Sequence, residues 1–143
     1  MADLKTFAQR IRKIGQRIEQ NADVAVRRCA LAVDAAVVIA TPVDTGRARA
    51  NWQVEVDRPI VTPIEKFSKS GQEAIDQGKE AIARYKGGHA SAAVHITNNL
   101  PYIGRLNDGH SAQAPAGFVE RAVLVGTDAI KGMKFTAVLT NEV

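Results

Sequence analysis

The sequence predicts a mixed α+β protein, with a long N-terminal helix and a small, mostly antiparallel sheet flanked by two further helices. Three observations indicate this fold class. Apolar residues at helical spacing open the chain, short runs of alternating apolar and polar residues follow, and two shorter helical segments lie around them. Because crossover helices do not regularly separate the strands, we expect α+β organisation rather than a doubly wound parallel sheet.

The first helix is expected over residues 3–41. Asp3 is a suitable N-cap, and Pro42 ends the helix. If unbroken, the helix is about 58 Å long, more than a compact domain needs; a break into two helices at residues 20–23 is the alternative. Its apolar residues form one stripe, large in the first half and small in the second, so we expect the second half to pack on a sheet. The stripe consists of Leu4, Phe7, Ile11, Ile14, Ile18, Ala22, Ala25, Cys29, Val33, Ala36 and Ala40.

The remaining elements are shorter and together complete one expected domain, residues 1–143. We expect a strand at 52–57, an irregular loop at 58–70, a surface helix at 70–86, a strand around 94–96, a helix at 117–132 and a C-terminal strand at 134–140. The regions are thus a long helix (3–41), a strand-and-loop region (42–100), a motif loop and helix (101–132) and the last strand. The two shorter helices are expected to bury Ala74, Ile75, Ala81, Ile82, Tyr85, Phe118, Ala122, Val125 and Ile130.

The composition excludes several classes of protein. Aromatic residues make up 5% of the 143 residues, so Ala, Val, Ile and Leu must fill the core. The single Cys precludes an internal disulfide and suits a reducing cytoplasm. The N-terminus lacks a signal-peptide apolar run, and no stretch reaches the roughly 18 apolar residues of a membrane span. We therefore expect neither secretion nor a membrane role.

The net charge of +4 is concentrated at one end of the chain. The first 41 residues carry seven Lys/Arg and four Asp/Glu, which accounts for +3. Arg10, Arg17 and Arg28 share one face of the first helix, beside the apolar stripe. Such a face is usually solvated, and contact with nucleic acid is the alternative.

The residue types of a hydrolytic triad are present in Asp44, His110 and Ser111. However, Ser111 has no Gly-x-Ser-x-Gly turn around it, and adjacent His and Ser side chains rarely point at one another. We expect no hydrolase, nuclease or metal-dependent activity. Arg47 and Arg49 leave two possibilities open: they bind a phosphate or carboxylate of another protein, or they solvate the end of the strand.

Metal, cofactor and redox sites are not expected either. His89, His95 and His110 lack Cys or carboxylate neighbours at ligand spacing, and His95 is expected to face solvent from a strand. The glycines at 104, 109 and 117 do not have phosphate-loop spacing. Cys29 lies on the apolar stripe, so we expect a buried small hydrophobe rather than a reactive thiol.

Two sequence blocks, residues 41–52 and 97–122, are rich in residues that determine backbone conformation but poor in paired acids, bases or ligands. In the first block, residues 44–46 predict a turn, because Asp bonds its own backbone and Gly adopts conformations that other residues avoid. We expect positive φ angles at Gly46 and Gly109. The pattern is typical of a surface that fits against other proteins.

At these blocks the sequence resembles the small tail-completion or neck proteins of long-tailed bacteriophages. The resemblance rests on residues 41–47 (TPVDTGR) followed by Trp52, and on residues 98–103 (NNLPYI), 106–111 (LNDGHS) and 113–117 (QAPAG), about 40 of the 143 residues. It does not extend to residues 58–90. Members have a sheet flanked by helices and are similar in fold to tail-terminator proteins, which form rings.

The resemblance implies a non-enzymatic virion protein that completes the tail or joins it to the head. The implied partners are further copies of the chain in a ring, expected to be a hexamer, with the tail-tube protein and the head-closure or connector proteins. Genomic DNA would pass through without sequence-specific binding, no cofactor is needed, and the protein would be made in the host cytoplasm and end in the virion neck. The expected interface residues are Pro42, Asp44, Thr45, Gly46, Arg47, Trp52, Pro101, Tyr102, Leu106, Gly109, His110, Ser111, Gln113, Pro115 and Gly117. The alternatives are a head-closure or adaptor protein and, from another class, a small basic DNA-binding protein.

Overall fold

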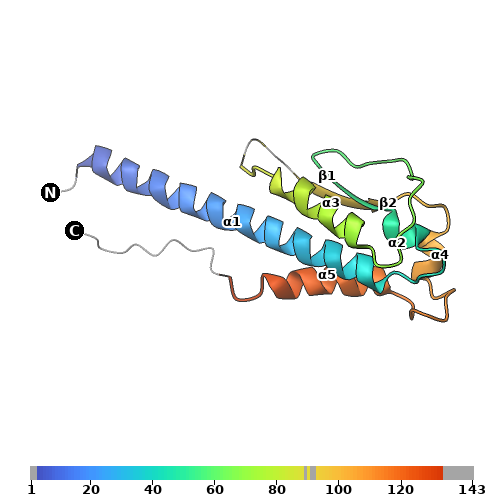
Figure 1. Cartoon of the computed structure of the whole chain (residues 1–143). Coiled ribbons are helices and arrows are strands. Elements are labelled where there is room, and N and C mark those ends of the chain that lie inside the picture. The colour runs from blue at the N-terminus through green and yellow to red at the C-terminus, as the bar shows by residue number, and fades with distance from the viewer. Residues whose placement is uncertain (1–2, 89, 91–92, 134–143) are drawn as a thin grey trace.

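The structure, a computed structural model, describes residues 3–88, 90 and 93–133. Its elements are α1 (Leu4–Ala40), α2 (Arg47–Ala50), β1 (Trp52–Val56), α3 (Gln72–Ala83), β2 (Val94–Asn98), α4 (Ile103–Asn107) and α5 (Phe118–Ala129). The predicted α+β class is confirmed (Figure 1). The strand predicted at residues 134–140 lies outside the described residues, as does His89.

Helix α1 begins and ends where the sequence predicts. The Asp3 carboxylate accepts hydrogen bonds from the backbone N of Thr6 (2.8 Å) and from Thr6 Oγ1 (2.9 Å), which lower the pKa of Asp3 below its usual value. Thr41, which precedes Pro42, is already extended, with φ −65° and ψ 128°. Between these ends the helix is continuous, so the alternative of a break at residues 20–23 is wrong.

The C-terminal half of α1 lies in the body of the protein, where it packs mainly against α5 and α3 (Figure 1). This corrects the expectation that a sheet covers it. The described sheet has only two strands, which contact α1 marginally. The small residues of the stripe instead permit close helix packing: a Cβ atom at Gly126 of α5 would collide with the Val33 side chain and lie 3.0 Å from Cys29 Sγ.

The sheet consists of β1 and β2, which pair antiparallel with Trp52 opposite Asn98 and Val54 opposite Ile96. Val54 is fully buried, and the Gln77 side chain of α3 bonds both its backbone N (3.0 Å) and its backbone O (2.8 Å). Helix α3 therefore covers the side of β1 that faces away from β2. Its apolar residues are buried as the sequence predicts.

Several exposures differ from the expected pattern. Val125 of α5 is 47% exposed and Ile130 is half-buried, although we expected both in the core, and Ala40 at the end of the α1 stripe is also exposed. Gln53 is buried although it lies on the polar side of the strand pattern, because its Nε2 donates to the Thr62 carbonyl at 2.9 Å. The long loop between β1 and α3 thus folds over β1. The main core lies where α1, β1, α3 and α5 meet, and it includes Val37, Val38, Trp52, Ile75 and Phe118.

Candidate functional site

The two sequence blocks meet at one end of the molecule, near α2 and α4 (Figure 1). The Gln113 side chain joins them: its Nε2 donates to the Val43 carbonyl (2.7 Å) and its Oε1 accepts from the Val43 N–H (2.8 Å). A depression of about 290 Å³ lies at this junction. It is lined by Pro42, Val43, Asp44, Thr45, Gly46, Arg47, Ala48, Tyr102, Leu106, His110, Ser111 and Gln113. We call it the motif depression.

The structure brings together ten of the fifteen predicted interface residues in the motif depression. Five others do not line it: Trp52, Pro101, Gly109, Pro115 and Gly117. Trp52 is buried in the core, where its Nε1 donates to Thr41 Oγ1 at 2.8 Å. Thr41 Oγ1 in turn donates to the Val37 carbonyl at 2.6 Å. Trp52 therefore fixes the end of α1 to the sheet, and its contribution to the surface is indirect.

Arg47 and Arg49 both have partners within the chain. Arg49 donates to three carbonyl groups: Lys69 at 2.7 Å and Ile39 and Thr41 at 2.8 Å each. Partial burial lowers the pKa of its guanidinium. Arg47 Nη2 lies 2.7 Å from the Glu65 carboxylate. Arg49 therefore completes the C-terminal end of α1, where backbone carbonyls lack helical partners, and is not a free anion clamp.

The predicted positive φ angles are confirmed at Gly46 (87°) and Gly109 (94°). Gly46 is buried, and its carbonyl accepts from the backbone N of Ala50 (3.0 Å) and of Ser68 (3.1 Å). A Cβ atom at Gly46 would lie 2.5 Å from the Ser68 carbonyl carbon. The turn at residues 44–46 therefore brings the long loop against α2, and only glycine fits there.

Asn107 holds the second block together, although it was not among the predicted interface residues. Its backbone O accepts from Gly117 N at 2.7 Å, and its Oδ1 accepts from Val119 N at 2.9 Å. Its Nδ2 donates to the Glu120 carboxylate at 3.0 Å, which lowers the pKa of Glu120. Asn107 thus caps α5 from α4, because Gly117 at the N-cap position has no side chain to do so. The only sequence signal for this role is an Asn eleven residues before the first residue of α5.

The three residues with the types of a hydrolytic triad do not form a catalytic arrangement. Asp44, His110 and Ser111 all line the motif depression, but no hydrogen bond joins them in the described structure. Asp44 and His110 are exposed, and Ser111 Oγ accepts from the Gln113 backbone N at 3.2 Å. Nothing here orients a base toward the hydroxyl, which nucleophilic catalysis requires.

The histidines and Cys29 are the other residues considered from the sequence. Among those residues, no group of three or more His, Cys, Asp or Glu side chains is placed to hold a metal ion. His95 is half-buried on β2 opposite Glu55, whereas we expected it to face solvent. Cys29 is half-buried at the contact between α1 and α5, which fits packing.

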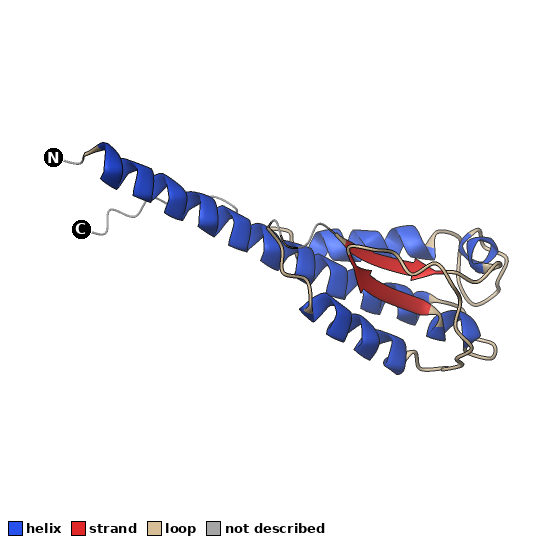
Figure 2. Ribbon diagram, turned by 90° about the horizontal axis from the view of Figure 1, so that it is seen from above, coloured by secondary structure: helices blue, strands red, loops and turns tan. Residues whose placement is uncertain are grey.

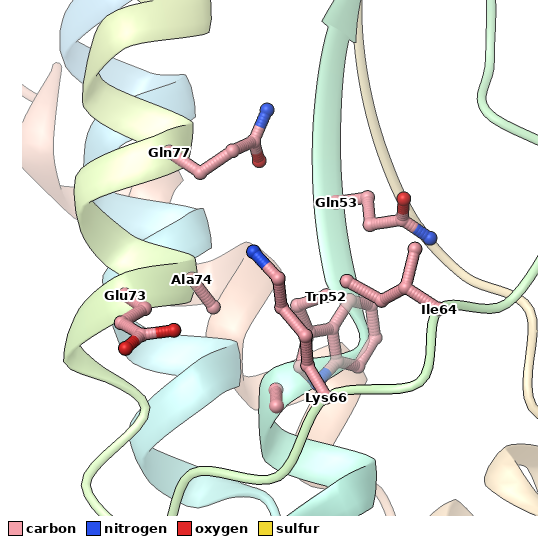
Figure 3. Close-up of a pocket in the computed structure, with 8 residues that line it drawn as sticks. Trp52, Gln53, Ile64, Lys66, Glu73, Ala74 and Gln77 are labelled. Carbon is pink, nitrogen blue, oxygen red and sulfur yellow. The ribbon is translucent and has the colours of Figure 1, made fainter.

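A second cavity, of about 230 Å³, lies between α3, β1 and the long loop (Figure 3). Lys66 and Glu73 stand at its sides, but the amide groups of Gln53 and Gln77 are bonded to Thr62 and Val54. The amide groups that could orient a ligand in this cavity are therefore already used within the protein. We therefore take the motif depression as the candidate functional site.

Comparison of the chain with protein-family models, curated proteins and solved structures finds no match. Within the described residues, no helix is both long enough and apolar enough to cross a membrane. The functional interpretation therefore depends on the geometry and on the resemblance of the two blocks.

Proposed function

We propose that the protein is a structural component of a long-tailed bacteriophage virion, which completes the tail or joins it to the head as a ring around the DNA channel. One observation carries the proposal: the two blocks that resemble neck proteins, 70 residues apart at Val43 and Gln113, are bonded into one surface. If the two blocks resembled neck proteins only by chance, the loops that contain them would not need to be bonded to each other.

The chemistry of this surface supports a docking role. Its hydrogen bonds join side chains to backbone groups of the same chain, as those of Gln113 and Arg49 do. These bonds hold the loops rigid. A loop that is ordered before it binds loses less conformational entropy on docking. Meanwhile Tyr102, 37% exposed, and His110 present amphipathic side chains to a neighbour.

The proposed partners are further copies of the chain, with six as the expected ring number, the tail-tube protein and the head-closure or connector proteins. A ring needs a heterologous interface that closes under rotation. DNA would pass through without base readout, and no cofactor or membrane takes part. The alternative within the same class is a head-closure or adaptor protein of the neck.

The basic N-terminal half of α1 favours one candidate from a different class, a small DNA-binding protein. Five Lys/Arg occupy residues 4–20 against one acidic residue, Glu19, and no ion pair among the described residues involves them. Binding through Arg10 and Arg17 would weaken steeply with salt, with a slope that reports several neutralised phosphates. A shallow slope would exclude this candidate.

The test is electron microscopy of the purified protein, alone and with the tail-tube protein of the same virus, followed by a density map of the virion neck. We expect closed rings on tube ends and the chain as a ring around the DNA path. A location along the genome inside the capsid, or absence from the particle, would contradict the proposal.

A further inference from the structure

The two outer edges of the sheet, one at β1 and one at β2, differ in how they are covered. The Gln77 side chain bonds the backbone N–H and C=O of Val54, so these groups point away from β2. Residues of an antiparallel pair alternate between bonded and non-bonded positions, so the N–H and C=O of Ile96, opposite Val54, point away from β1. Among the described residues, no hydrogen bond reaches these two groups of Ile96. The outer edge of β2 therefore presents backbone groups that another strand could bond.

An apolar groove of about 370 Å³ lies between β2, the C-terminal half of α1 and the end of α5. Figure 2 shows the two strands side by side along this half of α1. The groove is lined mainly by Val26, Cys29, Val33, Val94, Ile96 and Ile130, all of them half-buried. A strand added to the outer edge of β2 would place alternate side chains over this surface, because successive side chains of a strand point to opposite faces. We call it the β2 groove.

The described chain reaches the β2 groove where α5 ends. Ile130 is the first residue after the helix, and it lines the groove together with Val94 at the start of β2. Gly132, with φ 82°, then turns the chain, and the Met133 N–H donates to the Ile130 carbonyl at 3.2 Å. Residues 134–140, which lie outside the described residues, therefore follow from a point beside the groove.

These next residues have the pattern that the groove requires. In a strand, Phe135, Ala137 and Leu139 share one face, and the two threonines and Val138 share the other. At about 3.3 Å per residue, residues 134–140 span about 23 Å, enough to cover the five residues of β2. Because they begin at the Val94 end, they would run parallel to β2. Parallel pairing needs a long crossover, usually a helix, and α5 lies within residues 99–133.

We propose that residues 134–140 add to the outer edge of β2 of the same chain as a third, parallel strand, with Phe135, Ala137 and Leu139 in the β2 groove. The segment of the same chain is favoured over that of a second copy because Ile130 already holds its start at the groove, so that only a short connection has to be closed. The added strand covers an edge that could otherwise pair with other chains. The inference goes beyond the proposed function, because it concerns one copy of the chain and needs no virion.

The native Cys29 offers a direct test, because it lines the β2 groove. Under mild oxidation, we expect a cysteine on the inward face of the segment, in Ala137→Cys or Leu139→Cys, to form a disulfide with Cys29 of the same chain. The matched controls are Thr136→Cys and Val138→Cys, which place the thiol on the opposite face and should stay reduced. Non-reducing electrophoresis and mass spectrometry identify the linked residues.

The alternation between neighbouring positions is the decisive readout of this experiment. A disulfide needs the two Cα atoms within about 7 Å, so a strand seated in the groove links at one face only. Equal linkage at neighbouring positions, or none in all four variants, would overturn the proposal. Disulfide-linked dimers would show that the segment of a second copy occupies the groove, which would overturn the assignment to the same chain.

Amide hydrogen exchange of the full chain tests the pairing with β2 without a cross-link. The Ile96 N–H should be protected, and Leu139→Asp should raise its exchange rate at least about tenfold, because a carboxylate is not stable in an apolar groove. The control Thr136→Asp adds the same charge on the opposite face and should leave the rate unchanged. The Val54 N–H, which donates to Gln77, should stay protected in both variants and so report that the rest of the fold is intact.

An Ile96 N–H that exchanges as fast as in an unfolded chain, or equal effects of the two substitutions, would contradict the pairing. Neither experiment involves a ring or a tail tube. Failure of both would therefore overturn this inference and leave the proposed function intact.

Discussion

Asp34 is a buried carboxyl group on α1, with 2% of its surface exposed. Its Oδ1 has no hydrogen-bond partner in the described structure, and a Cβ atom at Gly78 of α3 would collide with Oδ2. The apolar surroundings disfavour the charged form and raise the pKa of Asp34 to about 7. This single residue should therefore make the free energy of unfolding depend on pH.

The direction of the dependence follows from proton binding. Between pH 4 and pH 7 the folded protein retains the Asp34 proton that the unfolded chain releases, so the free energy of unfolding falls as pH rises, by on the order of 4 kcal/mol in total. Below this window Asp34 is protonated in both the folded and the unfolded state. Above the window the loss in the free energy of unfolding stays constant. We expect Asp34→Asn to raise the free energy of unfolding at pH 8 by about 1–3 kcal/mol and to flatten the profile. Urea unfolding at pH 4, 6 and 8 measures this, with the exposed Asp76→Asn as control; a parallel shift at all three pH values would contradict the prediction.

Gly46 offers a second test at the residue scale. With φ 87° and the Ser68 backbone close by, it cannot accept a side chain without strain. We expect Gly46→Ala to lower the free energy of unfolding by about 1–3 kcal/mol. Gly104→Ala is the matched control, because Gly104 lies in α4 with nothing within 4 Å of its Cβ position, and alanine favours helix. Equal melting temperatures for both variants would show that the turn at Gly46 is not constrained.

At the scale of elements, Asn107 connects α4 to α5. We expect Asn107→Ala to cost about 1–2 kcal/mol, since α5 loses its cap and Glu120 loses its amide partner. Amide hydrogen exchange at Val119 should be faster in this variant, because the Val119 N–H donates to the Asn107 side chain in the unsubstituted protein. The neighbouring exposed Asp108→Ala should change neither. Unchanged protection at Val119 would mean that α5 starts without help from α4.

The sequence predicted elements whose signals are local. The limits of α1 follow from Asp3 and Pro42, and the strand β1 follows from alternation beginning at Trp52. The short helices α2 and α4 were missed, because four or five residues contain too little periodicity to detect. The packing of α1 on α5 was also missed, since a stripe of small residues fits a sheet and a helix equally well and Gly126 decides between them only in the folded chain.

In the candidate site, too, the features set by local sequence could be predicted, whereas the contacts between distant segments could not. The turn glycines at 46 and 109 were predictable, because their conformational requirement lies within a few residues. The bond from Arg49 to Lys69 and the clamp from Gln113 to Val43 were not, because they join segments 20 and 70 residues apart. The resemblance of two blocks indicated that they belong together, and the structure shows how they meet.

For the whole molecule, α2 and α4, which carry the motif depression, and the N-terminal end of α1 lie at opposite ends of an elongated shape (Figure 1). A change at the motif depression should therefore leave the distant part of α1 intact. We expect the double variant Tyr102→Ala/His110→Ala to reduce binding to the tail-tube protein at least about tenfold. Both side chains are exposed, so the melting temperature should change little.

The matched control is Lys79→Ala/Glu80→Ala on the exposed face of α3, which removes two surface side chains outside the motif depression. Tube binding is measured by cosedimentation. Retention of full tube binding by the Tyr102/His110 variant would remove the motif depression from the proposed interface.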